Sequence, residues 1–464
     1  MKWQTIVVTI VILWLIVACA AQPTAVSEPI PTDPPPTPTA ERAAAPVEID
    51  IGAANLLGDD EAAEGLLKAQ VALFEEAHPH IKINLVLWGW DAKAFPEQLA
   101  SGDVPDVMEV AATEGPLVID NGYAADITPF MEKWPLSSDF NELILSIFAR
   151  DGRIYAIPHI VYIMGLFYDK TLFTQAGLVD QNGEAVPPTN WDEFVSAAKA
   201  VKENTPAAGF CILTQHNQGG WNFVNWGWQA GGTFERQVGG QWEAAFDEAP
   251  IVEAANFIKQ LRWEHNVLQE DLALDAGGLF GKLSNHECGM ALIAPDWFNT
   301  IASDGNLDDY GLTKLPTGPA GDANLMGGAF NIIKADLSPE EQQAAFEWIT
   351  WYGFSREALE NDLRSQGGKN QWAYVNRSLM YKPNSQASIQ ERELLDKYRG
   401  LPYYKEYVEA AGKYARIEPP IAVQDLYAAL DGVLWELLNN ENADPQMLLS
   451  EAAEKFQAEY LDAE

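Results

Sequence analysis

Basic residues, histidines and cysteines are scarce in this chain, and each shortage excludes a class of function. Lysine and arginine together number 29 against 67 aspartates and glutamates, so the formal net charge is −38. Such an acidic chain has no basic surface for DNA, RNA or anionic lipid headgroups. Among six histidines only His78 and His80 lie close together, and no further ligand residues cluster near them. We therefore expect no nucleic acid partner, no metal site and no cofactor.

Cysteine occurs at three positions, Cys19, Cys211 and Cys288. Cys211 and Cys288 can form a disulfide if the chain is outside the cytoplasm. Both, however, stand at the start of apolar runs, where buried free cysteines are common. The sequence is compatible with either a disulfide or two buried free thiols, and it favours the free thiols.

The first residues have the pattern of a bacterial lipoprotein signal peptide over 1–19. Lys2 precedes an apolar run over 6–18 that is too short for a comfortable membrane span. The sequence Ile16-Val17-Ala18-Cys19 resembles the lipobox, in which the cysteine is lipidated and becomes the mature N-terminus. We expect Cys19 to hold the protein at the cell surface or in the periplasm. An uncleaved anchor is the alternative.

Residues 20–47 are predicted to be a disordered linker. The segment is rich in proline and threonine and has no periodic apolar face. Such a composition favours extended polyproline conformations at about 3.1 Å per residue, which gives a reach of roughly 80 Å. The linker is expected to hold the folded part away from the membrane.

A chain of 464 residues exceeds what one hydrophobic core usually serves, so two domains are expected. We expect them to meet within 152–173. Residues 154–157 have the pattern of a short strand that Pro158 ends, and 160–168 is an apolar, β-branched run too long for one ordinary strand. This run is predicted to leave one sheet and enter another, with a cleft at the crossing.

Apolar periodicity predicts a parallel sheet before the crossing. A strand over 48–54, a helix over 61–78 and an alternating strand over 81–87 form a βαβ unit. A helix over 95–101 and a strand over 106–110 repeat the cycle. Ligands of open parallel sheets bind at the carboxyl ends of the strands, so the loops there are candidate sites.

Short strands and helices alternate after the crossing. The aromatic, glycine-rich segment 221–232 is expected to lie outside any helix face. Residues 310–316 and 327–334 are predicted to carry the chain back to the first sheet. The other expected elements are strands over 209–213 and 288–294 and helices over 170–176, from 189, 250–266, 338–351, 355–363, 388–398, 423–439 and 444–461.

Several short motifs, in order over residues 48–365, resemble the family-1 extracellular solute-binding proteins, which are lipoprotein receptors of ABC importers. Each motif alone is weak, but the ordered set is specific. The segment after 365 is similar only in being helical. The matching pieces are Phe74-Glu-Glu-Ala-His-Pro-His-Ile-Lys-Ile, Ser101-Gly-Asp-Val-Pro-Asp-Val, Gly122-Tyr-Ala-Ala-Asp-Ile-Thr-Pro, Gly152-Arg-Ile-Tyr-Ala-Ile-Pro, Leu166-Phe-Tyr-Asp-Lys-Thr-Leu-Phe, Pro188-Thr-Asn-Trp-Asp-Glu-Phe, Cys288-Gly-Met-Ala-Leu, Leu315-Pro-Thr-Gly-Pro and Gly327-Gly328.

The resemblance implies an α/β, two-lobed periplasmic-binding-protein-like fold (type II), with hinged lobes and a ligand cleft between them. It implies an N-terminal lobe of 48–158 plus 326–365 and a C-terminal lobe of 159–325 plus 366–464. Lobes of this kind close on a ligand and deliver it to a membrane permease. The expected ligand is a sugar or oligosaccharide. The expected protein is a monomer that contacts the membrane only through its lipid anchor.

Aromatic residues beside acids or amides mark the expected sugar site, because sugar C–H faces lie against rings and hydroxyls bond to carboxylates and amides. Trp297 is the first choice, since its position resembles that of the family's stacking aromatic. Trp348, Trp351 and Tyr352 fall on one helix and are expected in the core. The expected ligand-binding residues are Trp88, Trp90, Asp91, Glu114, His159, Tyr162, Trp221, Trp226, Asp296, Trp297, Gly328 and Trp372.

Two other functions stay open. Asp91, Glu114 and Asp296 also suit a cation flanked by aromatic rings, so a polyamine or oligopeptide receptor is the alternative. A carbohydrate-active enzyme is weaker, because the sequence has no nucleophile motif or phosphate-binding loop and its acids lie on separate predicted loops. A phosphorylated sugar is disfavoured, because Lys93 is the only basic residue in the candidate loops.

Overall fold

The computed structural model describes residues 45–53, 61–302, 306–368, 379–397, 407 and 412–462. Residues 45–464 form one compact unit. The predicted signal peptide with Cys19, most of the predicted linker and Trp372 lie outside the described residues. Within the described ranges, no helix is long and apolar enough to cross a membrane.

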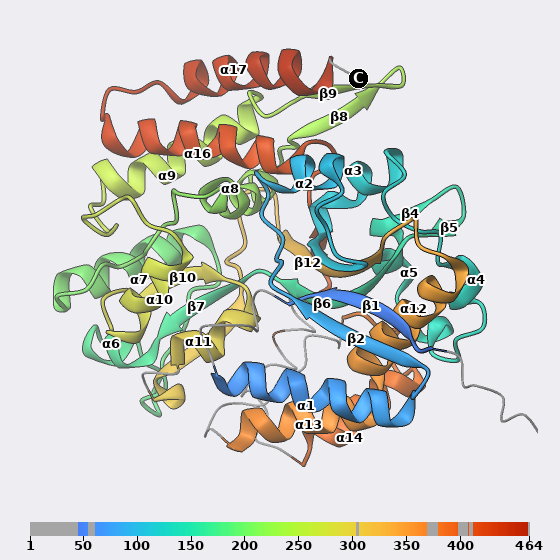
Figure 1. Ribbon diagram of the computed structural model, residues 1–464. Coiled ribbons are helices and arrows are strands. Elements are labelled where there is room, and N and C mark those ends of the chain that lie inside the picture. Colours follow the sequence, from blue (N-terminus) through green and yellow to red (C-terminus); the bar gives the residue numbers. More distant parts are fainter. Residues whose placement is uncertain are drawn as a thin grey trace, which may run out of the picture. The chain divides into compact units, whose positions relative to one another are not determined.

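Two sheets organise the described part of the chain (Figure 1). The first contains six strands, which are β13 (Ala415–Ile417), β12 (Asn324–Ile333), β3 (Val107–Ala111), β1 (Val47–Gly52) and β2 (Ile81–Val86) in spatial order, with β6 (Ala156–Ile163) also paired to β12. The second contains three antiparallel strands in the order β10 (Met290–Ile293), β7 (Gly165–Asp169) and β11 (Tyr310–Lys314).

Helices and two short ribbons complete the fold. The ribbons pair β4 (Ala149–Arg150) with β5 (Arg153–Ile154) and β8 (Glu235–Val238) with β9 (Gln241–Ala244). The helices are α1 (Glu61–Ala77), α2 (Phe95–Ser101), α3 (Gly115–Asp120), α4 (Thr128–Met131), α5 (Glu142–Leu145), α6 (Lys170–Gln175), α7 (Trp191–Asn204), α8 (Gln218–Gln229), α9 (Ala249–Trp263), α10 (Ala276–Ser284), α11 (Phe298–Ala302), α12 (Pro339–Phe354), α13 (Arg356–Gly368), α14 (Gln386–Leu395), α16 (Val423–Asn439) and α17 (Pro445–Phe456).

The predicted βαβ unit is confirmed. β1 and β2 pair in parallel, with Val47 opposite Ile81 and Gly52 opposite Val86, and α1 connects them. Ile81 and Ile83 of β2 are buried while Lys82 between them is exposed, which is the alternation expected of a half-buried strand. Their side chains pack with those of α1 and α12 in one core cluster.

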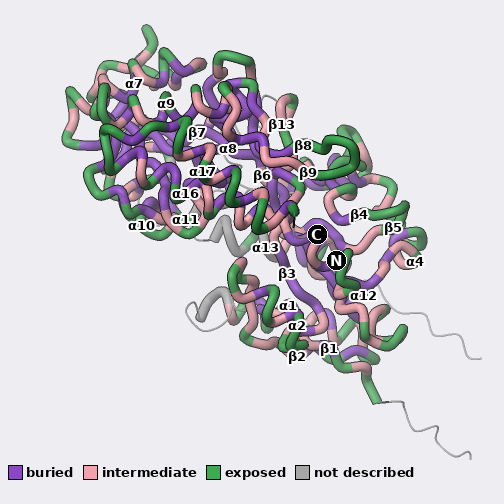
Figure 2. The backbone as a smooth tube through the Cα atoms, turned by 90° about the horizontal axis from the view of Figure 1, so that it is seen from above, coloured by how far each residue is buried: buried purple, intermediate pink, exposed green. Residues whose placement is uncertain are grey.

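The crossing between the sheets lies where the sequence predicts it. β6 pairs antiparallel with β12 in the first sheet, and β7 begins after Met164 as the central strand of the second. The backbone N–H of Met164 donates to the carbonyl of Leu325, 2.8 Å away, so even the connecting residue is bonded. Figure 2 shows that much of this stretch is buried, and every residue of β7 is buried.

A β-bulge interrupts the pairing at the start of the crossing. Ala329 of β12 lies opposite Ile160 and Phe330 lies opposite Pro158, so His159 is an extra residue on β6. Bulges bend a strand and re-aim the side chain of the extra residue. The bulge therefore decides where the His159 imidazole points.

Several predicted assignments differ from the structure. Segment 310–316 forms β11 in the second sheet, so β12 alone of the two predicted returning segments pairs with the first sheet. Segment 209–213 forms isolated bridges instead of a strand. β13, from the part that the resemblance assigns to the C-terminal lobe, pairs with β12 in the first sheet.

The aromatic, glycine-rich segment that we expected outside a helix forms α8. Every residue from Gly219 to Gln229 is buried, because α8 is enclosed by α9, α16 and neighbouring elements. Gly220 lies directly against the backbone of Tyr427 in α16, where a Cβ atom would collide with the carbonyl oxygen. Asn222, Asn225 and Gln229 recur three and four residues apart, as on one face of a helix, but the glycines of the segment, which lower helix propensity, obscured this pattern.

Cys211 and Cys288 form a disulfide with a Cα–Cα distance of 5.8 Å. The favoured interpretation of two free thiols was therefore wrong. The bond joins two segments that also meet through the bridges between Ala208 and Cys288 and between Cys211 and Ala291. Apolar surroundings, which suggested thiols, are equally compatible with a buried disulfide.

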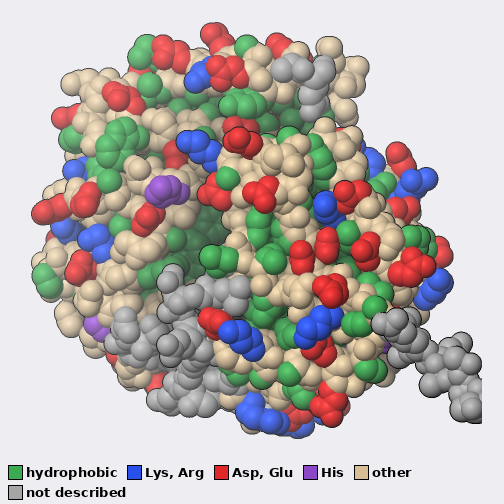
Figure 3. Space-filling view, in the orientation of Figure 1, with side chains coloured by type: hydrophobic (Ala, Val, Ile, Leu, Met, Phe, Trp, Pro, Cys, Tyr) green, Lys and Arg blue, Asp and Glu red, His purple; other side chains and the backbone are tan. Residues whose placement is uncertain are grey.

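The surface carries the acidic excess of the sequence. Red acidic side chains are spread over the face shown in Figure 3 and outnumber the blue basic ones. Hydrophobic side chains are visible in a hollow of the same face. No group of three potential metal ligands is found among the described residues.

Candidate functional site

A cavity of about 260 Å³ opens at the carboxyl ends of β1, β2 and β3, beside β6, β12 and α12. This is the edge of the parallel strands where ligand sites are expected. We call it the first-sheet cavity. Its lining includes Ile51, Gly52, Ala53, Leu67, Trp88, Gly89, Trp90, Glu109, Val110, Ala111, His159, Ile160, Tyr162, Gly328, Ala329, Asn331, Trp348, Ile349 and Tyr352.

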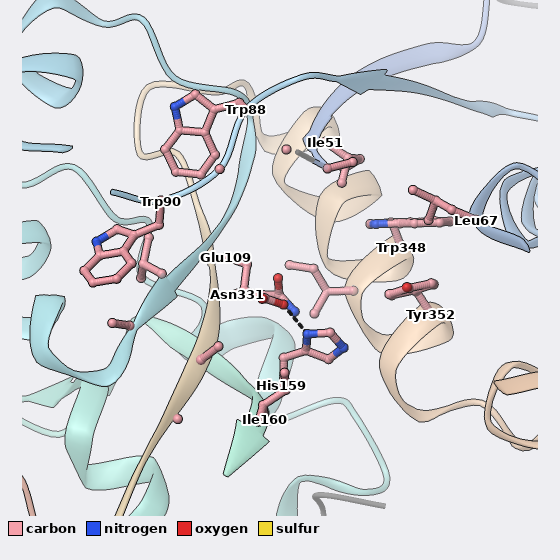
Figure 4. Close-up of a pocket in the computed structure, with 18 of the residues that line it drawn as sticks. Ile51, Leu67, Trp88, Trp90, Glu109, His159, Ile160, Asn331, Trp348 and Tyr352 are labelled. Atoms are coloured by element: carbon pink, nitrogen blue, oxygen red, sulfur yellow. Dashed lines mark hydrogen bonds and ion pairs between the residues drawn. The ribbon is translucent and has the colours of Figure 1, made fainter. Parts of the chain in front are cut away.

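Aromatic side chains stand on two sides of the cavity (Figure 4). Trp88 and Trp90 come from the loop that follows β2, whereas Trp348 and Tyr352 are one turn apart on α12. Trp348 and Tyr352 stack with ring centroids 5.0 Å apart and an interplanar angle of 13°. Flat rings on opposite sides suit a ligand with exposed C–H faces.

Polar side chains lie between these aromatic sides. Glu109 on β3 and His159 on β6 form an ion pair through Nδ1 of the imidazole (Figure 4). Burial raises the pKa of Glu109, but the charge of His159 and its hydrogen bond outweigh this and leave the pKa below its usual value. Asn331 on β12 is the cross-strand partner of Glu109 and lines the same cavity. These three side chains form the polar floor.

Backbone geometry explains one of the predicted glycines. A Cβ atom at Gly328 would collide with the carbonyl oxygen of Ile160 on β6. Gly328 therefore permits the close β6–β12 pairing that carries the His159 bulge, in addition to lining the cavity. Gly52 is similarly constrained, since a Cβ atom there would lie 2.7 Å from the ring of Trp88.

A second hollow, of about 800 Å³, lies between the turn after β3 and the start of α16. We call it the acidic groove, because Glu114, Glu418 and Asp425 line it. Burial raises the pKa of Glu114 to about 7. The hydrogen bond from Thr113 and the nearby indole N–H of Trp90 lower it, and the charge of Asp425 adds to the increase. Burial also raises the pKa of Glu418 to about 7, and the charge of Glu114 contributes.

Trp90 lies between the two hollows. Trp90 lines the first-sheet cavity and approaches Glu114 of the acidic groove closely enough to lower its pKa, although the indole N–H makes no hydrogen bond of normal geometry to the described residues. Tyr162 lines the cavity as well and packs edge-on against Trp221, with ring centroids 5.9 Å apart. Trp221 in turn lies 5.4 Å from Trp297.

The structure brings together five of the residues that the sequence predicts to bind ligand, and places the others elsewhere. Trp88, Trp90, His159, Tyr162 and Gly328 line the first-sheet cavity. Glu114 lines the acidic groove. Trp221 and Trp297 form an aromatic chain with Tyr162 and Phe280.

Of the remaining predicted residues, Asp91 and Trp226 line neither hollow. Asp91 is exposed, and its carboxylate accepts the backbone N–H groups of Lys93 and Ala94 at the start of α2. Trp226 is 2% exposed and lies in the core beside Trp191 and other aromatic rings. The side chain of Asp296 and the whole of Trp372 lie outside the described parts.

Four polar or aromatic residues of the cavity were not predicted as ligand contacts. Glu109 and Asn331 sit within β3 and β12, where they looked like ordinary strand residues. Trp348 and Tyr352 were assigned to the core. Trp348 does belong there at 2% exposure, and it lines the cavity as well. Glu109 and Asn331 could have been found as polar residues that lie opposite each other on neighbouring strands. Finding them in this way requires the order of the strands in the sheet to be known.

The family model of the bacterial extracellular solute-binding proteins matches residues 53–356. A putative binding protein of Brucella abortus is 23% identical over 281 residues, which is 58% of this chain and 64% of that protein. The chain thus spans just under two thirds of the length of such curated relatives. The diacetylchitobiose-binding protein DasA of Streptomyces coelicolor is 23% identical over 182 residues, covering 39% of this chain and 40% of that one.

The fold matches that of solved binding proteins. The maltose-bound MalE3 structure of T. maritima superposes with a TM-score of 0.69 at 19% identity, covering 89% of this chain and 99% of that one. The matched region of the family model contains the crossing and every residue that lines the first-sheet cavity, apart from Ile51 and Gly52 at its edge. The chain therefore belongs to the bacterial extracellular solute-binding proteins, whose fold is the two-lobed periplasmic-binding-protein fold.

Proposed function

We propose that the chain is the ligand-binding lipoprotein of an ABC importer, which captures a sugar or oligosaccharide and delivers it to a membrane permease. Family membership makes it a binding protein that acts outside the cytoplasm. The nature of the ligand, the permease partner, the lipid anchor at Cys19, the monomeric state and the absence of catalysis are the parts that we propose.

One observation carries the proposal. The first-sheet cavity combines aromatic sides with a polar floor in which Glu109 is paired with His159, and no lysine or arginine is among its described lining residues. A sugar ring needs apolar faces above and below it and hydrogen-bonding groups at its edge, and it carries no charge for the site to neutralise. The relatives named above support the same ligand class, since one was solved with maltose and another is named for diacetylchitobiose.

The crossing between the sheets is the hinge that this proposal needs. Residues 156–169 serve both sheets in one continuous run. His159 and Tyr162, within this run, line the first-sheet cavity. A ligand that contacts both lobes stabilises the closed arrangement to the extent that it binds that arrangement more tightly than the open one.

A cationic ligand is the second candidate, and the acidic groove favours it. Glu114, Glu418 and Asp425 line this groove together with the rings of Trp242 and Tyr460. A protonated amine beside carboxylates and aromatic rings gains from both ion pairing and cation–π contact. In contrast to the first-sheet cavity, the three carboxylates of this groove have no basic residue as hydrogen-bond partner among the described residues.

Thermal unfolding of the purified protein with a panel of neutral sugars, oligopeptides and polyamines tests both candidates. A ligand present at 100 times its dissociation constant is expected to raise the free energy of unfolding by about 2.7 kcal/mol. A response to sugars supports the proposal. If polyamines stabilise the protein and no carbohydrate does, the cationic ligand becomes the favoured candidate.

Product analysis after incubation with oligosaccharides tests the absence of catalysis. We expect each oligosaccharide to be recovered unchanged, because the sequence offers carboxylates on separate elements and no nucleophile motif. Turnover of any of them would contradict a purely ligand-binding role.

A further inference from the structure

The acidic groove lies between two parts of the protein that pack in different cores. One side of the groove is the turn after β3 with the start of α3, and Ala112 and Val118 there belong to the core cluster of β3 and β12. The other side is the start of α16, where Val423 and Leu426 pack in the cluster that contains α8 and α9. A hinge movement of one part against the other therefore changes the width of this groove.

A hydrogen bond spans the groove. Nε2 of Gln424, in the first turn of α16, donates to Oγ1 of Thr113 in the turn after β3, 3.2 Å away. Oε1 of the same glutamine accepts from Nδ2 of Asn217, which directly precedes α8, also at 3.2 Å. Gln424 is thus fixed on its own side by one end of its amide and reaches across the groove with the other.

Further hydrogen bonds extend this connection at both ends. Oγ1 of Thr113 donates to Oε1 of Glu114 at 3.1 Å. On the other side, the backbone N–H of Asn217 donates to the carboxylate of Asp431 in α16 at 2.8 Å, which holds a residue with a left-handed φ of 65°. A continuous run of hydrogen bonds therefore joins α8 and α16 to the carboxyl group of Glu114.

The bond across the groove keeps carboxyl groups from the two sides close together. Glu114 is 7% exposed, and its charge interacts with those of Asp425 and Glu418 on the opposite side. The hydroxyl of Tyr427 donates to Oε1 of Glu418 at 3.0 Å. Like charges at short range disfavour ionisation, so a narrow groove favours the neutral form of these carboxyl groups.

Other ionisable groups lie around Glu114 and Glu418, and they leave the surroundings acidic. Arg150 lines the groove, but Asp120 pairs with it at 2.6 Å. Arg416 lies over a tryptophan ring of α8. The acidic or neutral groups are Asp425 and Tyr427 of α16, Tyr162 of β6, Glu235 of β8, Glu459 and Tyr460.

The proton affinity of the groove depends on its width. With the two sides together, burial and the nearby negative charges raise the pKa values of Glu114 and Glu418 to about 7. Separation of the sides exposes both groups to water and removes each from the charge of the other, so their pKa values fall toward the ordinary value of about 4.3. Protonation therefore stabilises the narrow groove, fully below about pH 4.3, and this stabilisation is lost as the pH rises through about 7.

We propose that the hydrogen bond between Gln424 and Thr113 is a latch between the two lobes, which closes when the carboxyl groups beside it are protonated and opens when they ionise. The latch goes beyond the proposed function, because it acts on the arrangement of the lobes in the ligand-free protein and requires no particular ligand. Acidification is expected to favour latched molecules.

The chain supplies matched controls for both parts of the latch. Glu235 is also 7% exposed and burial raises its pKa to about 8, but it does not line the groove. Glu114→Gln and Glu235→Gln therefore remove similar carboxyl groups at the groove and away from it. Gln446 of α17 donates through Nε2 to the carbonyl of Asp247 at 2.8 Å, away from the groove. Gln424→Ala and Gln446→Ala compare a glutamine inside the latch with one outside it.

Pulsed electron paramagnetic resonance of the ligand-free full chain measures the distance across the groove. Spin labels are placed at the exposed positions 97, on α2, and 458, which belong to opposite sides and do not line the groove. Coupling through a keto amino acid leaves the disulfide intact. One carboxyl group with a pKa of about 7 should lower the ratio of short to long distances about tenfold between pH 6 and pH 8.

The variants separate the latch from its proton dependence. Gln424→Ala should give mainly long distances at both pH values, whereas Glu114→Gln should keep mainly short distances at pH 8. Gln446→Ala and Glu235→Gln should respond to pH as the unmodified protein does.

The unmodified protein gives a readout that does not depend on the folding of any variant. A distance distribution that is the same at pH 6 and pH 8 overturns the proposal. So does a pH response that survives Glu114→Gln, or a Gln424→Ala protein that retains the short distances. Because no ligand is added, these outcomes leave the proposed function standing, and thermal unfolding with the ligand panel tests it separately.

Discussion

At the scale of single residues, Glu109 of β3 and Glu114 of the turn after that strand have opposite electrostatic surroundings. Glu109 is bonded to His159, which lowers its pKa despite burial. Glu114, five positions later, faces Asp425 and Glu418 and has a pKa raised to about 7. The first carboxylate is held ionised by its partner, whereas the second gains a proton near neutral pH. Their contributions to folding stability must therefore depend on pH in opposite directions.

Glu114→Gln should stabilise the protein at alkaline pH and have little effect at acidic pH. A carboxyl group whose pKa is raised by folding contributes stability that is complete below its unfolded value, about 4.3, and lost as the pH rises through about 7. The amide removes the ionised form, so we expect a gain of about 2 kcal/mol at pH 8 over the unmodified protein. Urea unfolding of both proteins from pH 4.5 to 8 measures it.

Glu109→Gln serves as the contrasting control in the same pH series. Its carboxyl group has a lowered pKa, so its contribution is present above the unfolded value and lost as the pH falls through the folded one. This variant should be destabilised at neutral pH and approach the unmodified protein in acid. If the change in unfolding free energy depends on pH in the same way for both variants, the electrostatic surroundings of Glu109 and Glu114 are assigned wrongly.

At the scale of elements, the contact between α8 and α16 is predicted to tolerate no side chain at Gly220. A Cβ atom there would meet the backbone carbonyl of Tyr427, and backbone is unable to move away as a flexible side chain does. Gly220→Ala should cost about 1–3 kcal/mol or more by forcing the helices apart. Gly432→Ala, at an exposed position of α16 where nothing lies within 4 Å of the new atom, should instead stabilise by about 0.5–1 kcal/mol. Equal effects of the two substitutions in denaturant unfolding would refute the close packing.

The same helix shows where sequence patterns stop being informative. Strand β2 was predictable because Ile81 and Ile83 alternate with exposed residues, and α16 because its apolar stripe repeats every three to four residues. α8 is buried all round, although Asn222, Asn225 and Gln229 recur at helical spacing. Its glycines lower helix propensity, and Gly220 permits close packing with α16, a tertiary need that no local pattern displays.

The candidate site was predictable to a similar degree. Trp88 and Trp90 follow a recognisable strand, so their place at its carboxyl end could be expected. Glu109 and Asn331 become neighbours only because β12 returns to pair with β3, more than 200 residues later in the chain. The bulge at His159 depends on the pairing of the same strand, β12, with β6. Long-range sheet order, not residue type, separates the residues that were found from those that were missed.

At the scale of the whole molecule, acidic residues far outnumber basic ones. Even if each of the 29 basic residues paired with one of the 67 acids, 67 − 29 = 38 acids would remain without a basic partner. Many ion pairs of the described residues are exposed, such as that of Arg150 with Asp120 at 2.6 Å, and such pairs contribute little. Repulsion among the remaining carboxylates must therefore act against the compact state.

Salt is consequently expected to stabilise this protein. Raising NaCl from about 20 mM to about 500 mM shortens the screening length from tens of ångströms to a few, which weakens repulsion between distant carboxylates more than contacts within pairs. The melting temperature of the ligand-free protein at pH 8 should rise by about 2–5 °C and level off once repulsion is screened. The increase should shrink near pH 4.5, where many surface carboxylates carry protons, and an equal increase at both pH values would point to a salt effect unrelated to charge repulsion. A melting temperature that stays constant or falls with added NaCl at pH 8 would mean that attractive ion pairs, and not the acidic excess, dominate the electrostatics of the folded chain.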